Sequence, residues 1–335
     1  MILHPGILAL IVGSTIVLVM MLYAGWTGLR VLARWDFDSS SEEQLGLERK
    51  TYLVSTLASY ALGFEIVSGL LFLYTIDDLH SLFVGAMCAT GTLNANAVGW
   101  SALGVKGLIL FLAPIWIVFN HLDQRAGDYP IIRAKYLGLM LLIPLVALDL
   151  VLLISFFAGL EPEIITSCCG ALFSESGSSV ASEVAALPVA PMLVAFYLSV
   201  ALFIATGLTC LVSRSRLLRY LLTGISVALL LVSLTSVISF LSLYIYELPT
   251  HHCPFDMIQK NYSFIGYAIY LTLFAGVFFG LLPGLFQPLR RIPSLAPLIA
   301  EAEVRWLVLG VVSILMFVCI ASWPVVFGSL TMTGY

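Results

Sequence analysis

The densest group of reactive side chains in the sequence lies between positions 251 and 257. Two histidines, one cysteine, one aspartate and one methionine occur there: His251, His252, Cys253, Asp256 and Met257. Thiolate, imidazole and thioether groups suit copper(I) and zinc, whereas magnesium prefers oxygen ligands. A thiol beside a histidine is also deprotonated more readily, which favours redox exchange. This segment is therefore the first candidate for a metal or redox site.

Two other segments carry cysteine and could contribute to the same site. Met87 and Cys88 lie in a segment rich in turn formers, and Cys168 and Cys169 stand side by side before a stretch rich in serine and glycine. A four-ligand shell could combine the cysteine and a histidine of the first segment with thiols from either of these. We therefore predict a metal or redox site at Cys88, Cys168, Cys169, His251, His252 and Cys253, with Met87, His80, Asp256 and Met257 as secondary candidates.

A second interpretation of these residues is thiol–disulfide chemistry. The run Cys253, Pro254, Phe255 and Asp256 resembles half of the CPxC motif of thioredoxin-like oxidoreductases. Asp256 stands where the second cysteine of that motif would be, so the dithiol cycle of that family is not implied. A resolving thiol from another segment, such as Cys88, could take its place. Four cysteines in two pairs are also similar to membrane thiol:quinone oxidoreductases, although no helix motif of that family is present.

A third interpretation is purely structural. In an oxidising compartment the four cysteines would form two disulfides that tie the connecting segments together. Four cysteines allow three pairings. The chain would then be a membrane anchor or scaffold subunit without chemistry of its own. Metal binding, thiol redox chemistry and structural disulfides all stay open, and the histidines favour the first two, because disulfides do not need them.

The composition indicates which elements must position these residues. Of 335 residues, 61% are apolar and only 10% are charged, and the mean hydropathy is +1.06. Soluble domains carry about 25% charged residues, and a helix needs about 20 apolar residues to cross a bilayer. The sequence therefore predicts an all-α, polytopic membrane protein, a single domain over 1–335, with about eight helices at 7–31, 51–75, 101–119, 137–159, 190–213, 220–246, 265–288 and 306–328.

The basic residues predict the orientation of these helices. Thirteen of the 15 Lys and Arg residues fall in alternate connections between the predicted helices or, for Arg30, at the adjoining helix end, and only Lys106 and Lys260 lie elsewhere. Basic connections stay on the cytoplasmic side of a membrane. Both termini and the segments with reactive residues are therefore expected to be non-cytoplasmic. A bacterial inner membrane, with the cysteine cluster on its periplasmic face, fits this arrangement.

Three charged residues fall well inside predicted helices, away from the ends: Glu65, Lys106 and Asp149. A charged residue at the centre of a membrane helix costs about 2.5–3.5 kcal/mol on insertion scales, and such residues usually face the interior of the bundle. The functional interpretation is a path for a proton, an ion or a quinone. The structural interpretation is an ion pair, for example between Lys106 and Glu65.

Missing motifs narrow the class of protein further. The sequence has no CxxCH motif, no phosphate-binding loop and no dinucleotide fingerprint, so no haem or nucleotide motif is present. It also lacks the basic patch of a nucleic-acid-binding protein. We therefore predict an inner-membrane component of a respiratory, redox or metal-handling system that uses copper, zinc or quinone. Its expected partners are membrane lipid and other membrane or periplasmic redox subunits.

Overall fold

The computed structural model describes residues 3–36, 41–161, 166, 180–213 and 215–330. No β-strand occurs in these ranges, and eight helices are long and apolar enough to cross a membrane. The predicted all-α class and the eight long apolar helices are therefore confirmed. The chain divides into two compact units: unit 1 comprises Met1–Leu82 and Thr92–Ile164, and unit 2 comprises Phe83–Gly91 and Ile165–Tyr335. The assignment to a single domain stays a prediction.

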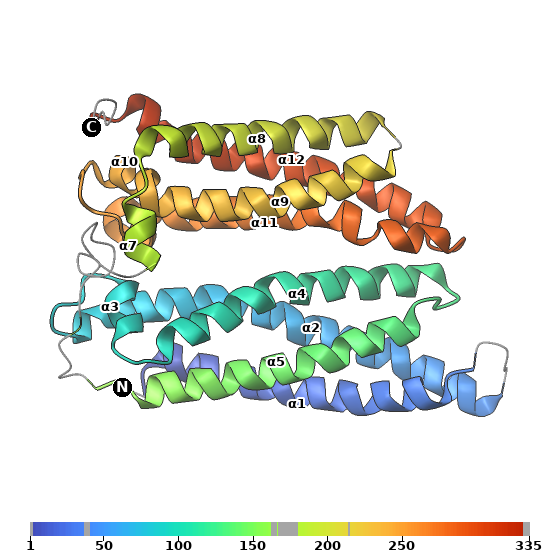
Figure 1. Cartoon of the computed structure of the whole chain (residues 1–335). Helices are drawn as coiled ribbons and strands as arrows, with labels where there is room; N and C mark the ends of the chain where they lie inside the picture. The colour runs from blue at the N-terminus through green and yellow to red at the C-terminus, as the bar shows by residue number, and fades with distance from the viewer. Residues whose placement is uncertain (1–2, 37–40, 162–165, 167–179, 214, 331–335) are drawn as a thin grey trace. The chain divides into compact units, whose positions relative to one another are not determined.

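Unit 1 is a bundle of four long helices (Figure 1). They are α1 (Pro5–Arg34), α2 (Glu42–Asp78), α4 (Gly99–Ala126) and α5 (Ile132–Ala158), with the 3₁₀ turn η1 (Leu79–Leu82) after α2. The short helix α3 (Ala89–Asn94), which precedes α4, begins in unit 2 and ends in unit 1. Each long helix contacts the next, and α5 packs back against α1. The side chain of His4 lies 3.2 Å from Asp78, so the start of α1 meets the end of α2. This is an up-and-down four-helix bundle.

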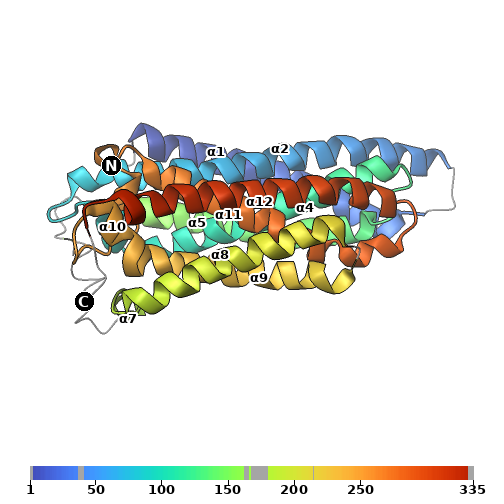
Figure 2. The same cartoon turned by 90° about the horizontal axis from the view of Figure 1, so that it is seen from above.

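Unit 2 is also a bundle of four long helices, which are labelled in Figure 2. Its long helices are α8 (Val189–Val212), α9 (Arg216–Ser236), α11 (Ile265–Leu285) and α12 (Ala296–Phe327). Helix α9 continues through a π-helical turn (Val237–Leu241) into α10 (Ser242–Tyr246), and the short segments are α7 (Val180–Ala185), η3 (Asp256–Ile258), η4 (Lys260–Tyr262) and η5 (Gln287–Arg291). Consecutive long helices are again neighbours, and α12 packs against α8.

Glycines on α11 let the helices of unit 2 approach closely. A Cβ atom on Gly280 would lie 2.5 Å from the Phe203 ring of α8 and 2.4 Å from Ser226 Oγ of α9. One turn later, a Cβ atom on Gly284 would lie 2.2 Å from Thr223 Oγ1. Small residues at such positions are typical of helix packing in membranes, where close backbone approach supplies much of the association energy.

Three helices are markedly longer than predicted. The second long helix, expected at 51–75, begins nine residues earlier and runs over 37 residues from Glu42 to Asp78. The third long helix, expected at 101–119, runs over 28 residues from Gly99 to Ala126. The last begins at Ala296, ten residues before the predicted start at 306. Its first turns carry Glu301, Glu303 and Arg305, which lower the hydropathy without interrupting the helix. Hydropathy therefore locates the apolar part of a helix and misses polar turns that extend it.

Candidate functional site

Two cysteines far apart in the sequence meet in unit 2. Cys88 immediately precedes α3, and Cys253 lies in the connection between α10 and η3. Their sulfur atoms are 3.4 Å apart, although 165 positions separate them along the chain. Both side chains are fully buried. The two thiols therefore form a direct sulfur–sulfur contact that is shielded from solvent.

A carboxylate completes this group. Asp256 begins η3, three positions after Cys253, and its Oδ1 atom accepts a hydrogen bond of 3.3 Å from the Cys253 thiol. One ligand atom each from Cys88, Cys253 and Asp256 lies within 4.8 Å of the other two. On its other side, Asp256 Oδ2 contacts His251 Nε2, and the His251 side chain is partly exposed. We call Cys88, Cys253, Asp256 and His251 the thiol–carboxylate site.

The surroundings of Asp256 favour its ionised form. Burial alone would raise the pKa of this carboxyl. Hydrogen bonds from His251 and from the two thiols outweigh burial and hold the pKa of Asp256 below its ordinary value. Asp256 is therefore an anion that accepts a hydrogen bond from the Cys253 thiol and lies next to the His251 imidazole.

Tyrosines fix the backbone of the connection that bears Cys253. The hydroxyl of Tyr246, at the end of α10, donates to the Cys253 carbonyl at 2.6 Å and accepts from the Met257 amide at 2.9 Å. The Tyr270 hydroxyl of α11 donates to the carbonyl of Pro254 at 2.6 Å. These buried hydrogen bonds satisfy backbone groups that no regular helix pairs. They hold the thiol and the carboxylate in place from two helices.

The segment that bears Cys88 is fixed separately. Gln259 Nε2 donates to the Met87 carbonyl at 2.8 Å, which ties the two cysteine-bearing connections together. The Thr166 amide donates to the Val84 carbonyl at 3.1 Å. Gly85 follows with a φ of +88°, and a Cβ atom there would lie 2.9 Å from the Thr166 carbonyl oxygen. The turn before Cys88 therefore requires glycine.

The other predicted ligands have contacts of their own, are described only by their burial, or lie outside the described residues. His252 turns its Nδ1 atom to the Ile238 carbonyl at 2.8 Å. Met257 is buried, whereas Met87 is 64% exposed. Cys168 and Cys169 lie outside the described residues. His80 belongs to unit 1, where its Nδ1 atom contacts the Asp77 carbonyl.

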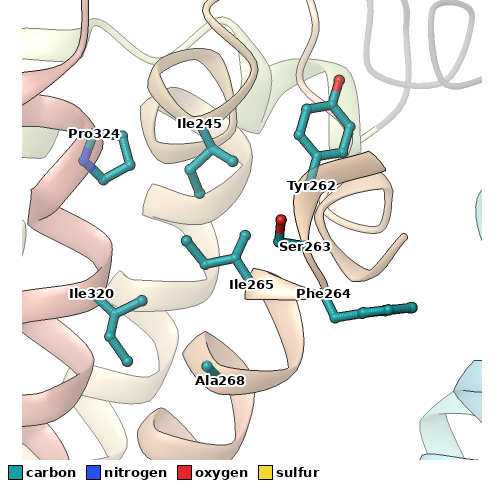
Figure 3. A pocket seen from close by; sticks show the side chains of 8 residues that line it. All are labelled: Ile245, Tyr262, Ser263, Phe264, Ile265, Ala268, Ile320 and Pro324. Atoms are coloured by element: carbon teal, nitrogen blue, oxygen red, sulfur yellow. The ribbon is translucent and has the colours of Figure 1, made fainter. Parts of the chain in front are cut away.

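An open pocket of about 550 Å³ lies in unit 2 near this site. Figure 3 shows Ile320 and Pro324 of α12 on one side of it, with Ile245 and Ile265 opposite; Tyr262, Ser263, Phe264 and Ala268 complete the lining. The ring centroids of Tyr262 and Tyr246 are 4.7 Å apart, and the Tyr246 hydroxyl donates to the Cys253 carbonyl. The lining is mostly apolar, and the pocket is open.

A second charged group lies in unit 1, where Glu65, Lys106 and Asp149 converge from α2, α4 and α5. Lys106 Nζ is 3.0 Å from Glu65 Oε2 and 2.7 Å from Asp149 Oδ2. It also donates to Ser68 Oγ at 2.8 Å. The predicted ion pair between Lys106 and Glu65 is confirmed, and Asp149 joins it. We call Glu65, Lys106 and Asp149 the buried triad.

The sequence analysis did not predict two other buried ion-pair groups. In unit 1, Lys135 Nζ lies 2.6 Å from Asp123 Oδ2, and both side chains are fully buried. In unit 2, Glu303 contacts Arg219 at 2.7 Å and Arg290 at 2.6 Å. The first of these pairs could have been predicted from the sequence, because Asp123 and Lys135 carry opposite charges on either side of a short connection between two predicted helices. Each group joins helix ends, which points to a structural role.

No protein-family model, no curated protein and no solved structure matches this chain.

Proposed function

We propose that this chain is an integral membrane thiol oxidoreductase whose redox couple is Cys88 and Cys253, on the periplasmic side of a bacterial inner membrane. The observation that carries the proposal is the 3.4 Å contact between two buried sulfur atoms from distant parts of the chain. A disulfide has a sulfur–sulfur distance of about 2.05 Å. A small shift of either side chain would therefore close the bond.

The reaction that we propose is oxidation of the dithiol by a quinone. Both S–H bonds break and one S–S bond forms, while two electrons and two protons convert the quinone to a quinol. Asp256 accepts a thiol proton and His251 carries it away from the buried sulfur atoms. The apolar pocket beside Tyr262 is where we expect the quinone ring to enter. Membrane or periplasmic proteins whose thiols re-reduce the couple are the expected partners.

A soft-metal site is the second candidate, and one observation favours it. The two thiols and the Asp256 carboxylate place three ligand atoms within 4.8 Å of one another. Thiolates suit copper(I) or zinc, and zinc binds protein ligands at about 2.0–2.3 Å. A bound metal would hold the two cysteines reduced and would prevent the redox cycle. The two candidates therefore predict opposite thiol states.

Thiol counting separates these functions. The purified protein carries alanine at Cys168, Cys169, Cys210 and Cys319, so that only Cys88 and Cys253 report. After reduction, it is exposed to a short-chain quinone, denatured, alkylated and weighed by mass spectrometry. We expect two alkylated thiols before quinone and none afterwards, with one quinol formed per disulfide. The matched variant Cys88→Ser in the same background forms no quinol.

Three other results would contradict the redox proposal. Two thiols that stay reduced with stoichiometric copper or zinc would support the metal site. A disulfide that mild reductants and quinol leave unchanged would support the anchor or scaffold role. Quinol formation that persists in Cys88→Ser would show that the oxidised group lies elsewhere.

A further inference from the structure

We propose that the buried triad of unit 1 binds one exchangeable proton inside the helical bundle. This site is separate from the thiol–carboxylate site and does not depend on the proposed redox function. The first observation is the burial of all three charged groups: the side chains of Lys106, Glu65 and Asp149 are 3%, 0% and 1% exposed. Charges this far from water are tolerated only when they are balanced.

The charges of the triad do not balance when all three residues are ionised. Two carboxylates surround a single ammonium group, which leaves one net negative charge. The nearest other charged side chains along these helices are Asp77 on α2, His121 on α4 and Lys135 on α5, each at least twelve positions away. Helix α1, which packs against α2 and α5, carries no charged side chain before Arg30. No group on these helices supplies the missing positive charge.

The carboxylates also have oxygen atoms without hydrogen-bond partners. Within the described residues, Glu65 Oε1 and Asp149 Oδ1 are buried and no donor reaches them. An unpaired anionic oxygen in a dry interior is strongly unfavourable, and such a group usually takes up a proton. Protonation of either oxygen would bring the triad to zero net charge without moving a helix. The unpartnered oxygens and the charge count thus lead to the same conclusion independently.

A metal cation fits this place less well than a proton. Hard cations take six or more oxygen ligands at 2.0–2.6 Å. The triad offers two unpartnered carboxylate oxygens, and Ser68 Oγ is already bonded to Lys106 and to Glu65. The ammonium group lies between the carboxylates and would repel a second cation. A proton needs no further ligands and occupies no space.

Infrared spectroscopy tests the proposal, because a protonated carboxyl has a carbonyl stretch that a carboxylate lacks. The full-length protein in lipid nanodiscs at neutral pH is compared with Asp149→Asn and Glu65→Gln. An amide mimics the neutral acid, so either variant leaves one cation and one anion and needs no proton. We expect the wild-type spectrum to contain a carboxylic-acid band that shifts in D₂O and is lost in both variants. Having two variants keeps the test valid if one fails to fold.

The matched control is Asp123→Asn. Asp123 is also a buried aspartate bonded to a lysine, but its pair is balanced. This variant should therefore retain the band. The proposal is overturned if neither triad variant loses a carboxylic-acid band. It is also overturned if the wild-type protein binds one sodium or potassium ion per chain and both triad variants lose it.

Discussion

The charge on Lys106 should stabilise unit 1 only because two carboxylates surround it. Replacing Lys106 with methionine keeps an unbranched side chain of similar length but leaves Glu65 and Asp149 without a cation. The two contacts measure 3.0 and 2.7 Å. At an effective dielectric constant of about 20, an ionised carboxylate at either distance attracts the ammonium group by about 5–6 kcal/mol. With one carboxyl protonated, as proposed above, one such attraction operates and most of it offsets the desolvation of the two ions; loss of one partner from a buried ion pair typically costs about 3–5 kcal/mol.

We therefore expect Lys106→Met to lower the free energy of unfolding by about 3–5 kcal/mol. The triple variant Lys106→Met, Glu65→Gln, Asp149→Asn should recover to within about 1–2 kcal/mol of wild type, because apolar or neutral replacements of a whole buried ion group are often tolerated. Equilibrium unfolding in mixed micelles, followed by circular dichroism, measures both. The exposed Lys50→Met should change stability by no more than about 0.5 kcal/mol.

The triple variant decides between charge and packing. If it is no more stable than Lys106→Met alone, the lysine contributes through its aliphatic contacts and the electrostatic argument is wrong. A destabilisation of Lys106→Met below about 1 kcal/mol, typical of exposed pairs, would also refute it.

Three further predictions concern other parts of the chain. The pKa of Asp256 is lowered from its ordinary value of 3.8, so its charge should stabilise the thiol–carboxylate site above pH 3.8. This contribution should disappear as the pH falls through the lower folded-state pKa. Hydrogen-exchange rates of wild type and Asp256→Asn should therefore differ at neutral pH and converge in strong acid. Glu303→Gln removes the negative charge that Arg219 and Arg290 contact, and should lower the free energy of unfolding by about 3–5 kcal/mol in mixed micelles. A change near zero would show that the two arginines bind other acceptors. Gly85 has a φ of +88° and lies against the Thr166 carbonyl, so Gly85→Ala should lower the free energy of unfolding by about 1–3 kcal/mol and speed alkylation of Cys88. An unchanged alkylation rate would argue against a rigid turn.

Hydropathy predicted the helices well because a membrane-length apolar run has few alternatives to a helix. It was less successful at the ends, where polar turns such as those around Glu301 and Glu303 belong to the helix. The two-unit division was not predicted. It depends on which helices pack together. The apolar faces of α1 and α8 carry no sequence feature that predicts which helices they contact.

The candidate site was predicted in its residue types more than in its geometry. Cys253 and Asp256 were recognisable as a local cluster, and Cys88 as a possible third member. Their contact depends on backbone hydrogen bonds such as those of Gln259 and Tyr246, which no spacing rule predicts. His252 adjoins Cys253 in sequence, and its Nδ1 atom contacts the Ile238 carbonyl, so its membership of the site stays a prediction.

The two units have the same helix order and neighbours but carry different chemistry. Each has a buried ion pair where its third long helix connects to its fourth, Asp123 with Lys135 in one and Arg290 with Glu303 in the other. Among the described residues, unit 1 has charged side chains near the middle of its long helices, and unit 2 has the pair of thiols in contact. Oxidation of a dithiol by a quinone transfers as many protons as electrons, so the proposed redox reaction does not require a proton site in unit 1. The triad would therefore still need an explanation if the redox proposal failed, and the redox proposal would survive a negative infrared result.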